Sequence, residues 1–115
     1  MKDKLFLDDI VTPLCRYPTS NDEDWDIVKS FDEFKNYILT NGIPKIISFD
    51  HDLGISEGND GNDCAKWLVE YCINNKIIEP NFVTLVHSMN PVGAERIKNT
   101  FKYFFDYCNK TNGEF

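Results

Sequence analysis

Four short apolar runs, rich in β-branched and aromatic residues, recur along the chain and predict four buried β-strands. They cover residues 4–9, 25–29, 46–49 and 81–86. Three of these runs end in polar residues that carry chemistry: Asp8-Asp9, Asp50-His51-Asp52 and His87-Ser88. The carboxyl ends of parallel strands share one edge of an open α/β sheet, so we expect one site at that edge.

Apolar residues at helical spacing predict three helices between and after these strands. The first begins at Ser30, where Ser30 and Glu33 match a capping box, and it stops at Asn41-Gly42. The second follows Gly61, with Asp60 or Asn62 as its cap, and the third runs from Pro91 to about Cys108. Residues 10–24 are broken by prolines and by a polar run, which predicts an irregular connection with about one helical turn.

The alternation of strands and helices predicts a mostly parallel sheet with right-handed crossovers. We therefore expect an α/β fold: a small, doubly wound three-layer sandwich around a four-stranded sheet, receiver-like (flavodoxin-like) in outline. One domain spans residues 1–115, with its core at about 4–108. The loop 55–61, small and acidic, is expected to be mobile and to lie beside the site.

Charge narrows the possible ligands. The formal net charge is −7 and the pI about 4.7, which argues against duplex DNA as a partner because that binding needs many cations on phosphates. A small phosphorylated ligand in a local pocket is still compatible, particularly together with a divalent cation.

The four cysteines show no metal-ligand or C-x-x-C spacing, and Cys64, Cys72 and Cys108 fall on apolar helix faces, where core thiols are expected. The sequence has no secretory leader pattern and no apolar run of membrane-spanning length. We therefore expect a cytoplasmic protein without a membrane partner. Oligomeric state is left open.

The acids Asp8, Asp9, Asp50 and Asp52 would crowd together if their strands are neighbours. Crowded carboxylates are unfavourable unless they share a proton or a cation, and Mg²⁺ prefers such oxygen ligands. The sequence thus predicts a divalent cation site, with Mg²⁺ as the expected ion. The alternative for any single aspartate is that it caps a turn or a helix.

His51 and His87 are the only histidines in the chain, and each follows an apolar strand. Two histidines beside a phosphodiester can serve as general base and general acid. Ser88 and Asn90 open the last helix and can bind an anion there. The structural alternatives are that the histidines are core residues and that Ser88 or Asn90 only caps the helix.

Four motifs occur in order and together resemble the cyclic-phosphate-processing receiver domain, an offshoot of the response-regulator receiver fold. They are Leu5-Phe6-Leu7-Asp8-Asp9, Trp25-x-x-Val28-Lys29-Ser30, Ser48-Phe49-Asp50-His51-Asp52-Leu53-Gly54 and His87-Ser88-x-Asn90-Pro91-x-Gly93. The resemblance spans about residues 4–105 and implies a receiver-like fold that acts on cyclic phosphates of nucleotides or RNA ends.

The same resemblance implies roles for individual residues. Asp8 and Asp9 match the receiver's metal-binding acids, Asp50 the aspartate that receivers phosphorylate, and Ser88 the hydroxyl residue after the next strand; the two histidines mark the offshoot. Lys29 stands where arginine is common and would contact phosphate. Val11 stands where the offshoot often has arginine, with Arg16 nearby, and the fifth strand with its phosphoryl-binding lysine is expected to be lacking.

Two functions from different classes follow. The first is a metal-assisted phosphoesterase that uses the aspartate cluster with Asp50, His51 and His87 on a cyclic nucleotide or an RNA end with a cyclic phosphate. The second is a non-catalytic, degenerate receiver that binds a nucleotide or a protein partner. A third possibility, a working phosphoacceptor receiver, requires Asp50 to accept a phosphoryl group.

Overall fold

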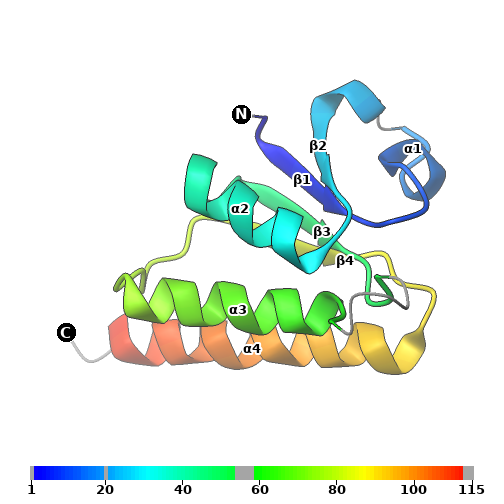
Figure 1. Ribbon diagram of the computed structural model, residues 1–115. Helices are drawn as coiled ribbons and strands as arrows, with labels where there is room; N and C mark the ends of the chain where they lie inside the picture. The colour runs from blue at the N-terminus through cyan, green and yellow to red at the C-terminus, as the bar shows by residue number, and fades with distance from the viewer. Residues whose placement is uncertain (1, 20, 54–58, 113–115) are drawn as a thin grey trace.

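The computed structural model describes residues 2–19, 21–53 and 59–112 (Figure 1). All predicted strands and long helices are present, and the predicted irregular connection contains one short α-helix and a 3₁₀ turn at Asp22–Asp24. In chain order the elements are β1 (Lys4–Leu7), α1 (Pro13–Arg16), β2 (Trp25–Val28), α2 (Phe31–Asn41), β3 (Ile46–Phe49), α3 (Gly61–Asn74), β4 (Val83–Val86) and α4 (Pro91–Asn112). Residues 54–58, most of the loop expected to be mobile, lie outside the described residues.

The sheet has the strand order β2-β1-β3-β4, and every pairing is parallel. The last residues of the strands are in register: Leu7 lies opposite Val28 and Phe49, and Phe49 lies opposite Val86. The fold is therefore the predicted α/β, receiver-like architecture around four parallel strands.

Strands β1, β3 and β4 are each extended by one more backbone hydrogen bond at the carboxyl end. The amide of Asp8 donates to the Val28 carbonyl at 3.1 Å, that of Asp50 to the Leu7 carbonyl at 3.0 Å, and that of His87 to the Phe49 carbonyl at 3.0 Å. The first residue after each of these three strands is thus held by the sheet itself. This fixes Asp8, Asp50 and His87 side by side at one edge.

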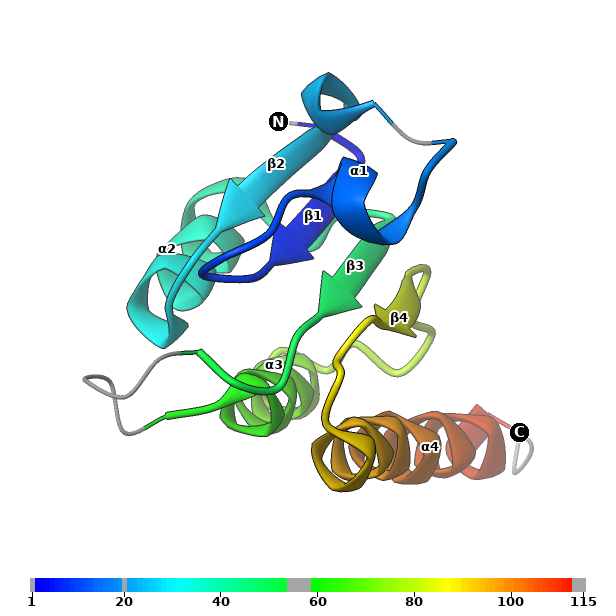
Figure 2. The same cartoon turned by 90° about the vertical axis from the view of Figure 1, so that its right-hand side faces the viewer.

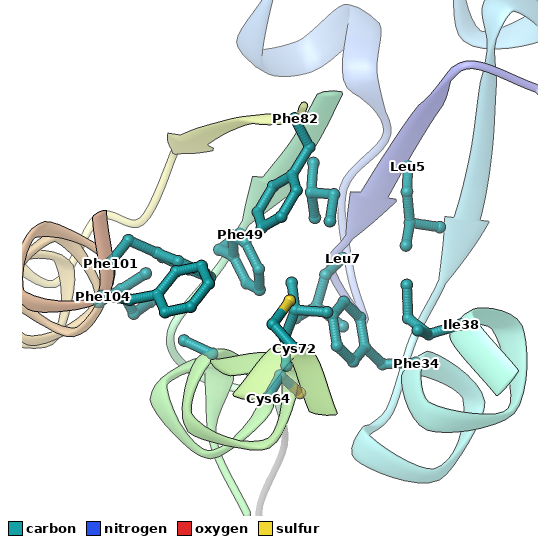
Figure 3. Close-up of a cluster of buried hydrophobic side chains, with 14 of the residues drawn as sticks. Leu5, Leu7, Phe34, Ile38, Phe49, Cys64, Cys72, Phe82, Phe101 and Phe104 are labelled. Atoms are coloured by element: carbon teal, nitrogen blue, oxygen red, sulfur yellow. The ribbon is translucent and has the colours of Figure 1, made fainter. Parts of the chain in front are cut away.

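Helices α2, α3 and α4 cover one face of the sheet, and the main core lies beneath them (Figures 1 and 2). Alternate strand residues such as Leu5, Leu7 and Phe49 point into this core, where Figure 3 shows them against side chains of the three helices. Cys64, Cys72 and Cys108 are buried in the same cluster, as predicted for core thiols.

The opposite face has a thinner cover, made by α1 and the residues around it (Figure 2). Tyr17 and Trp25 stack with ring centroids 5.8 Å apart, and Trp25 meets the edge of the Phe6 ring at 5.7 Å. This second layer follows from residues 10–24, whose prolines and polar residues cannot form a long helix. It leaves Val83 and Leu85 of β4 exposed at 56% and 37%.

The helix starts near the site are capped by side chains. Ser30 accepts a hydrogen bond from the Glu33 amide at 3.1 Å, and Asp60 and Asp63 form a complete capping box at α3. The amide of Gly61 also donates to the His51 carbonyl at 2.7 Å, which ties the start of α3 to the end of β3. Within the described ranges, no helix combines the length and the apolar character needed to cross a bilayer.

Candidate functional site

Three side chains meet where β1, β3 and β4 end. Asp8, Asp50 and His87 each place one potential ligand atom within 4.8 Å of the others. Asp8 is 3% exposed, and His87 is also buried, whereas Asp50 is half-buried. The sheet register therefore joins three of the predicted site residues into one group.

Tyr17, Ser48 and Asp8 form a hydrogen-bonded chain through His87. His87 Nε2 lies 3.0 Å from Asp8 Oδ2, its Nδ1 lies 2.7 Å from Ser48 Oγ, and Ser48 Oγ lies 2.7 Å from the Tyr17 hydroxyl. The imidazole also stacks on the Phe6 ring, with centroids 4.2 Å apart. Both ring nitrogens of His87 are engaged within the protein.

The direction of these hydrogen bonds follows from the protonation state of His87. Burial lowers the pKa of His87 below 6.5, although the hydrogen bond and the charge of Asp8 act to raise it. A neutral imidazole that donates from Nε2 to the Asp8 carboxylate must accept at Nδ1. The Tyr17 hydroxyl therefore donates to Ser48, Ser48 donates to His87 Nδ1, and His87 Nε2 donates to Asp8.

Ser48→Ala should lower the free energy of unfolding by about 1–3 kcal/mol, because it leaves the buried Nδ1 of His87 without a donor. Tyr17→Phe should cost less, since Ser48 can still donate to His87. Urea denaturation of the two variants and the wild type would measure both losses. Equal losses, or none for Ser48→Ala, would contradict the assigned chain.

Asp8 is further fixed by the chain that follows it. Its Oδ1 accepts hydrogen bonds from the amides of Ile10 and Val11, at 2.8 and 3.1 Å. With His87 on Oδ2, the carboxylate has three donors in place before any ligand is bound. Asp8 is therefore a preorganised anionic group and not a mobile surface acid.

The surroundings of Asp50 and Asp9 fit a divalent cation. Burial, followed by the charge of Asp8, raises the pKa of Asp50 from 3.8 to about 6, with smaller contributions from Asp52 and Asp9. Asp9 Oδ1 is buried and has no hydrogen-bond partner. Carboxylate oxygens that repel each other, one of them without a donor among the described residues, form the oxygen-rich ligand set that Mg²⁺ prefers.

A hollow of about 200 Å³, which we call the edge hollow, opens beside this group. It is lined by Asp8, Ile10, Val11, Arg16, Asp50, Asp52 and Met89. A larger hollow of about 480 Å³ lies around Lys45, Tyr71 and Phe82, at the amino end of the strands. We place the candidate site at the edge hollow because it contains the clustered acids, whereas size alone would favour the other.

His51 lies apart from the Asp8–Asp50–His87 group. Successive residues after a strand point to opposite faces of the sheet, so Asp50 faces the edge hollow while His51 turns toward the starts of α3 and α4. Its Nδ1 lies 2.9 Å from Asp52 Oδ1. Its Nε2 lies 3.1 Å from Asp60 Oδ2, a charge contact that lacks hydrogen-bond alignment.

Gly93 gives the His51 ring its space. A Cβ built on Gly93 would come within 2.2 Å of His51 Cγ, so a larger residue here must displace the ring. Gly93, the last residue of the His-Ser-x-Asn-Pro-x-Gly stretch, thus leaves the space that His51 of the Asp-His-Asp stretch occupies. Asp52, hydrogen-bonded to that histidine, lines the edge hollow and connects His51 to the site indirectly.

The predicted phosphate-binding residues have local roles in the structure. Ser88 Oγ accepts from the Asn90 amide, and Asn90 Oδ1 accepts from the Gly93 amide, each at 3.1 Å. Asn90 therefore caps the start of α4, and Ser88 closes the turn just before it, which agrees with the structural alternative for these two side chains. Lys29 is exposed and falls outside the residues that line the edge hollow.

Residues that motif reasoning did not select also belong to the site. Ser48 was a detectable signal, as a polar residue within the apolar run 46–49. Tyr17 comes from the irregular connection, where the alternation of polar and apolar residues did not distinguish it. Arg16, noted in the sequence close to the position of the absent family arginine, lines the edge hollow.

The candidate site lies within the part of the chain that matches a known protein family. The family model of the cyclic-phosphate processing receiver domain matches residues 3–103. Among curated proteins, none matches the chain significantly. A solved structure described as a yeast Spc42 trimeric coiled-coil fusion is 20% identical, with a TM-score of 0.50 over 87% of this chain and 63% of that one. At this identity the likeness concerns the fold alone, and this chain spans less than two thirds of that protein.

Proposed function

The chain belongs to the cyclic-phosphate processing receiver domain family, which supports a role in cyclic phosphate processing, and we propose that this role is metal-assisted hydrolysis of a cyclic phosphodiester. The observation that carries the proposal is the Asp8–Asp50–His87 group beside the edge hollow. The substrate would be a cyclic nucleotide or an RNA end with a 2′,3′-cyclic phosphate.

Asp8, Asp9 and Asp50 would hold the divalent cation, with Asp52 at the open side of the same hollow. Mg²⁺ fits this donor set, and when bound it would supply a Lewis acid for the phosphoryl oxygens. His87 would act through Asp8, because both its ring nitrogens are already engaged. The hydrogen bond from its Nε2 holds the Asp8 carboxylate in one orientation.

Hydrolysis needs one proton removed from water and one delivered to the leaving oxygen. A phosphorus–oxygen bond to water forms, and one ester bond of the ring breaks. We assign the first transfer to Asp52 with His51 behind it, since Asp52 lines the hollow and contacts His51 Nδ1. The leaving alkoxide would take its proton from solvent at the open side of the hollow.

Phosphorus NMR of the purified protein with a panel of cyclic phosphates tests the proposal. The panel holds 2′,3′-cyclic mononucleotides, 3′,5′-cyclic mononucleotides and cyclic dinucleotides, each with Mg²⁺ and with a chelator. We expect a cyclic resonance to convert to a monoester with Mg²⁺ only. The resonance that converts would name the substrate class.

His51→Ala should slow that conversion by about 100-fold or more, because Asp52 loses its imidazole partner. His87→Ala should slow it by about 10- to 100-fold, because Asp8 loses the donor that orients it. Lys102→Gln is a control, because its side chain is exposed on α4 and is not among the hollow-lining residues. Unchanged turnover in both histidine variants would contradict the proposed roles. The rates come from the same phosphorus spectra recorded over time.

A second candidate function is binding without turnover, as in a degenerate receiver that sequesters or senses its ligand. The observation that favours it is the burial of His87 with both nitrogens engaged, which leaves it no free position for proton transfer. A cyclic resonance that shifts or broadens with Mg²⁺ but never converts would support this function and contradict hydrolysis.

A further inference from the structure

Arg16 is a cation at the candidate site to which the described part of the chain gives no ion-pair partner. It is the last residue of α1 and lines the edge hollow together with Asp8, Asp50 and Asp52. Its Nε is buried and has no hydrogen-bond partner. Across residues 2–19, 21–53 and 59–112, Arg16 forms no ion pair within 4.0 Å.

This arrangement is unusual for an arginine next to several carboxylates. The guanidinium carries five donors in a planar fork that matches carboxylates and phosphates, and a buried donor left unpaired is unfavourable. The nearby Asp8 carboxylate is already satisfied by His87 and by two backbone amides. The guanidinium is therefore available to an anion that enters the hollow.

Hydrogen bonds hold the backbone on both sides of Arg16. The amide of Leu14 donates to Asp22 Oδ1 at 2.7 Å, and that of Tyr17 donates to the Pro13 carbonyl at 2.7 Å. The Tyr17 ring stacks on Trp25, and its hydroxyl contacts Ser48 Oγ. The positive charge of Arg16 also reaches the site, because it contributes to the lowered pKa of His87.

We propose that Arg16 binds the phosphate group of the ligand in the edge hollow, which it lines together with the carboxylates that would hold the cation. This inference rests on the proposed function and adds to it a specific anion-binding residue. A phosphate there would have oxygens for the cation and oxygens for the guanidinium fork at the same time. The role that sequence reasoning gave to Lys29 would then belong to Arg16.

Two probes test the cation-binding carboxylates and the anion-binding Arg16 separately. Electron paramagnetic resonance of Mn²⁺ added alone measures cation binding. Calorimetry of inorganic phosphate added to the Mg²⁺-loaded protein measures anion binding. We expect Arg16→Gln to weaken phosphate binding by at least about tenfold and to leave Mn²⁺ binding unchanged or slightly tighter. Arg16→Lys should lie between the two, since it keeps the charge but loses the fork.

Lys102→Gln is the matched control, because it removes one positive charge from an exposed position on α4 outside the edge hollow, and it should bind phosphate like the wild type. Phosphate binding that survives Arg16→Gln, or that is absent from the Mg²⁺-loaded wild type, would overturn the inference. The proposed hydrolysis fails independently, through the cyclic phosphate panel. Arg16-dependent phosphate binding without any turnover would uphold this inference and refute hydrolysis.

Discussion

Gly61→Ala should destabilise the protein by about 2–4 kcal/mol, in contrast to the usual effect of such a change. Alanine in place of glycine in a helix normally stabilises by up to about 1 kcal/mol, because glycine has the larger backbone entropy to lose. Here a Cβ on Gly61 would lie 1.7 Å from the backbone carbonyl oxygen of Asp50. Because the clash is with backbone, either β3 must move at its end or α3 must shift its start.

The same clash should also disturb the site. The Gly61 amide donates to the His51 carbonyl at 2.7 Å, so a displaced helix start pulls on the segment that carries Asp50 and His51. Urea denaturation would give the stability loss, and Mn²⁺ binding would report the site. If Gly61→Ala were as stable as the wild type, the end of β3 and the start of α3 could move apart without cost, which would contradict this prediction.

Gly93→Ala is the matched control, because it also adds one methyl group near the start of a helix. Its Cβ would meet the His51 ring, which can rotate, whereas the Asp50 carbonyl cannot. We therefore expect a smaller loss of stability together with altered imidazole NMR signals from His51. Similar stability losses in both variants would argue against the distinction between a side-chain and a backbone clash.

The sequence was sufficient to predict the sheet and the grouping of its strand ends. Each strand is a short apolar run, and parallel register alone brings Asp8, Asp50 and His87 to one edge. Such predictions succeed because burial and strand period are local properties of the chain. The family resemblance, carried by motifs at these strand ends, is confirmed by the match over residues 3–103.

The surroundings of the individual site residues could not be predicted in the same way. Asp50 and His51 are adjacent in sequence, and sequence reasoning placed both at one site, yet the strand period sends them to opposite faces. Arg16 and Tyr17 reach the site from an irregular segment, whose path depends on stacking with Trp25 and contact with Ser48. Tertiary contacts of this kind leave no periodic signal in the sequence.

Asp50→Asn should stabilise the cation-free protein at neutral pH and abolish its response to divalent cations. Burial and the charge of Asp8 raise the pKa of Asp50 from 3.8 to about 6, so its ionised form is unfavourable in the folded state. The full shift would correspond to about 3 kcal/mol, and because the side chain is half-buried we discount this to about 1–2 kcal/mol.

The pH dependence follows from the sign of the shift. Between pH 3.8 and about 6 the folded protein holds the Asp50 proton more tightly than the unfolded chain does. The stability that this provides is complete below pH 3.8 and is lost as the pH rises through about 6. An asparagine does not titrate, so the stability advantage of the variant should be absent at pH 4 and complete near pH 8.

Thermal and urea unfolding of the two proteins in chelator, across this pH range, would measure the difference. Mg²⁺ should reverse the order at pH 8, because the wild type gains the binding free energy of the ion and the variant has lost one of its carboxylates. Lys102→Gln serves as a charge control, because Lys102 is exposed on α4 and is not among the residues that line the edge hollow. A wild type that remains less stable than Asp50→Asn at saturating Mg²⁺ would mean that the crowded carboxylates are not relieved by a cation, and the metal-assisted function would lose its physical basis.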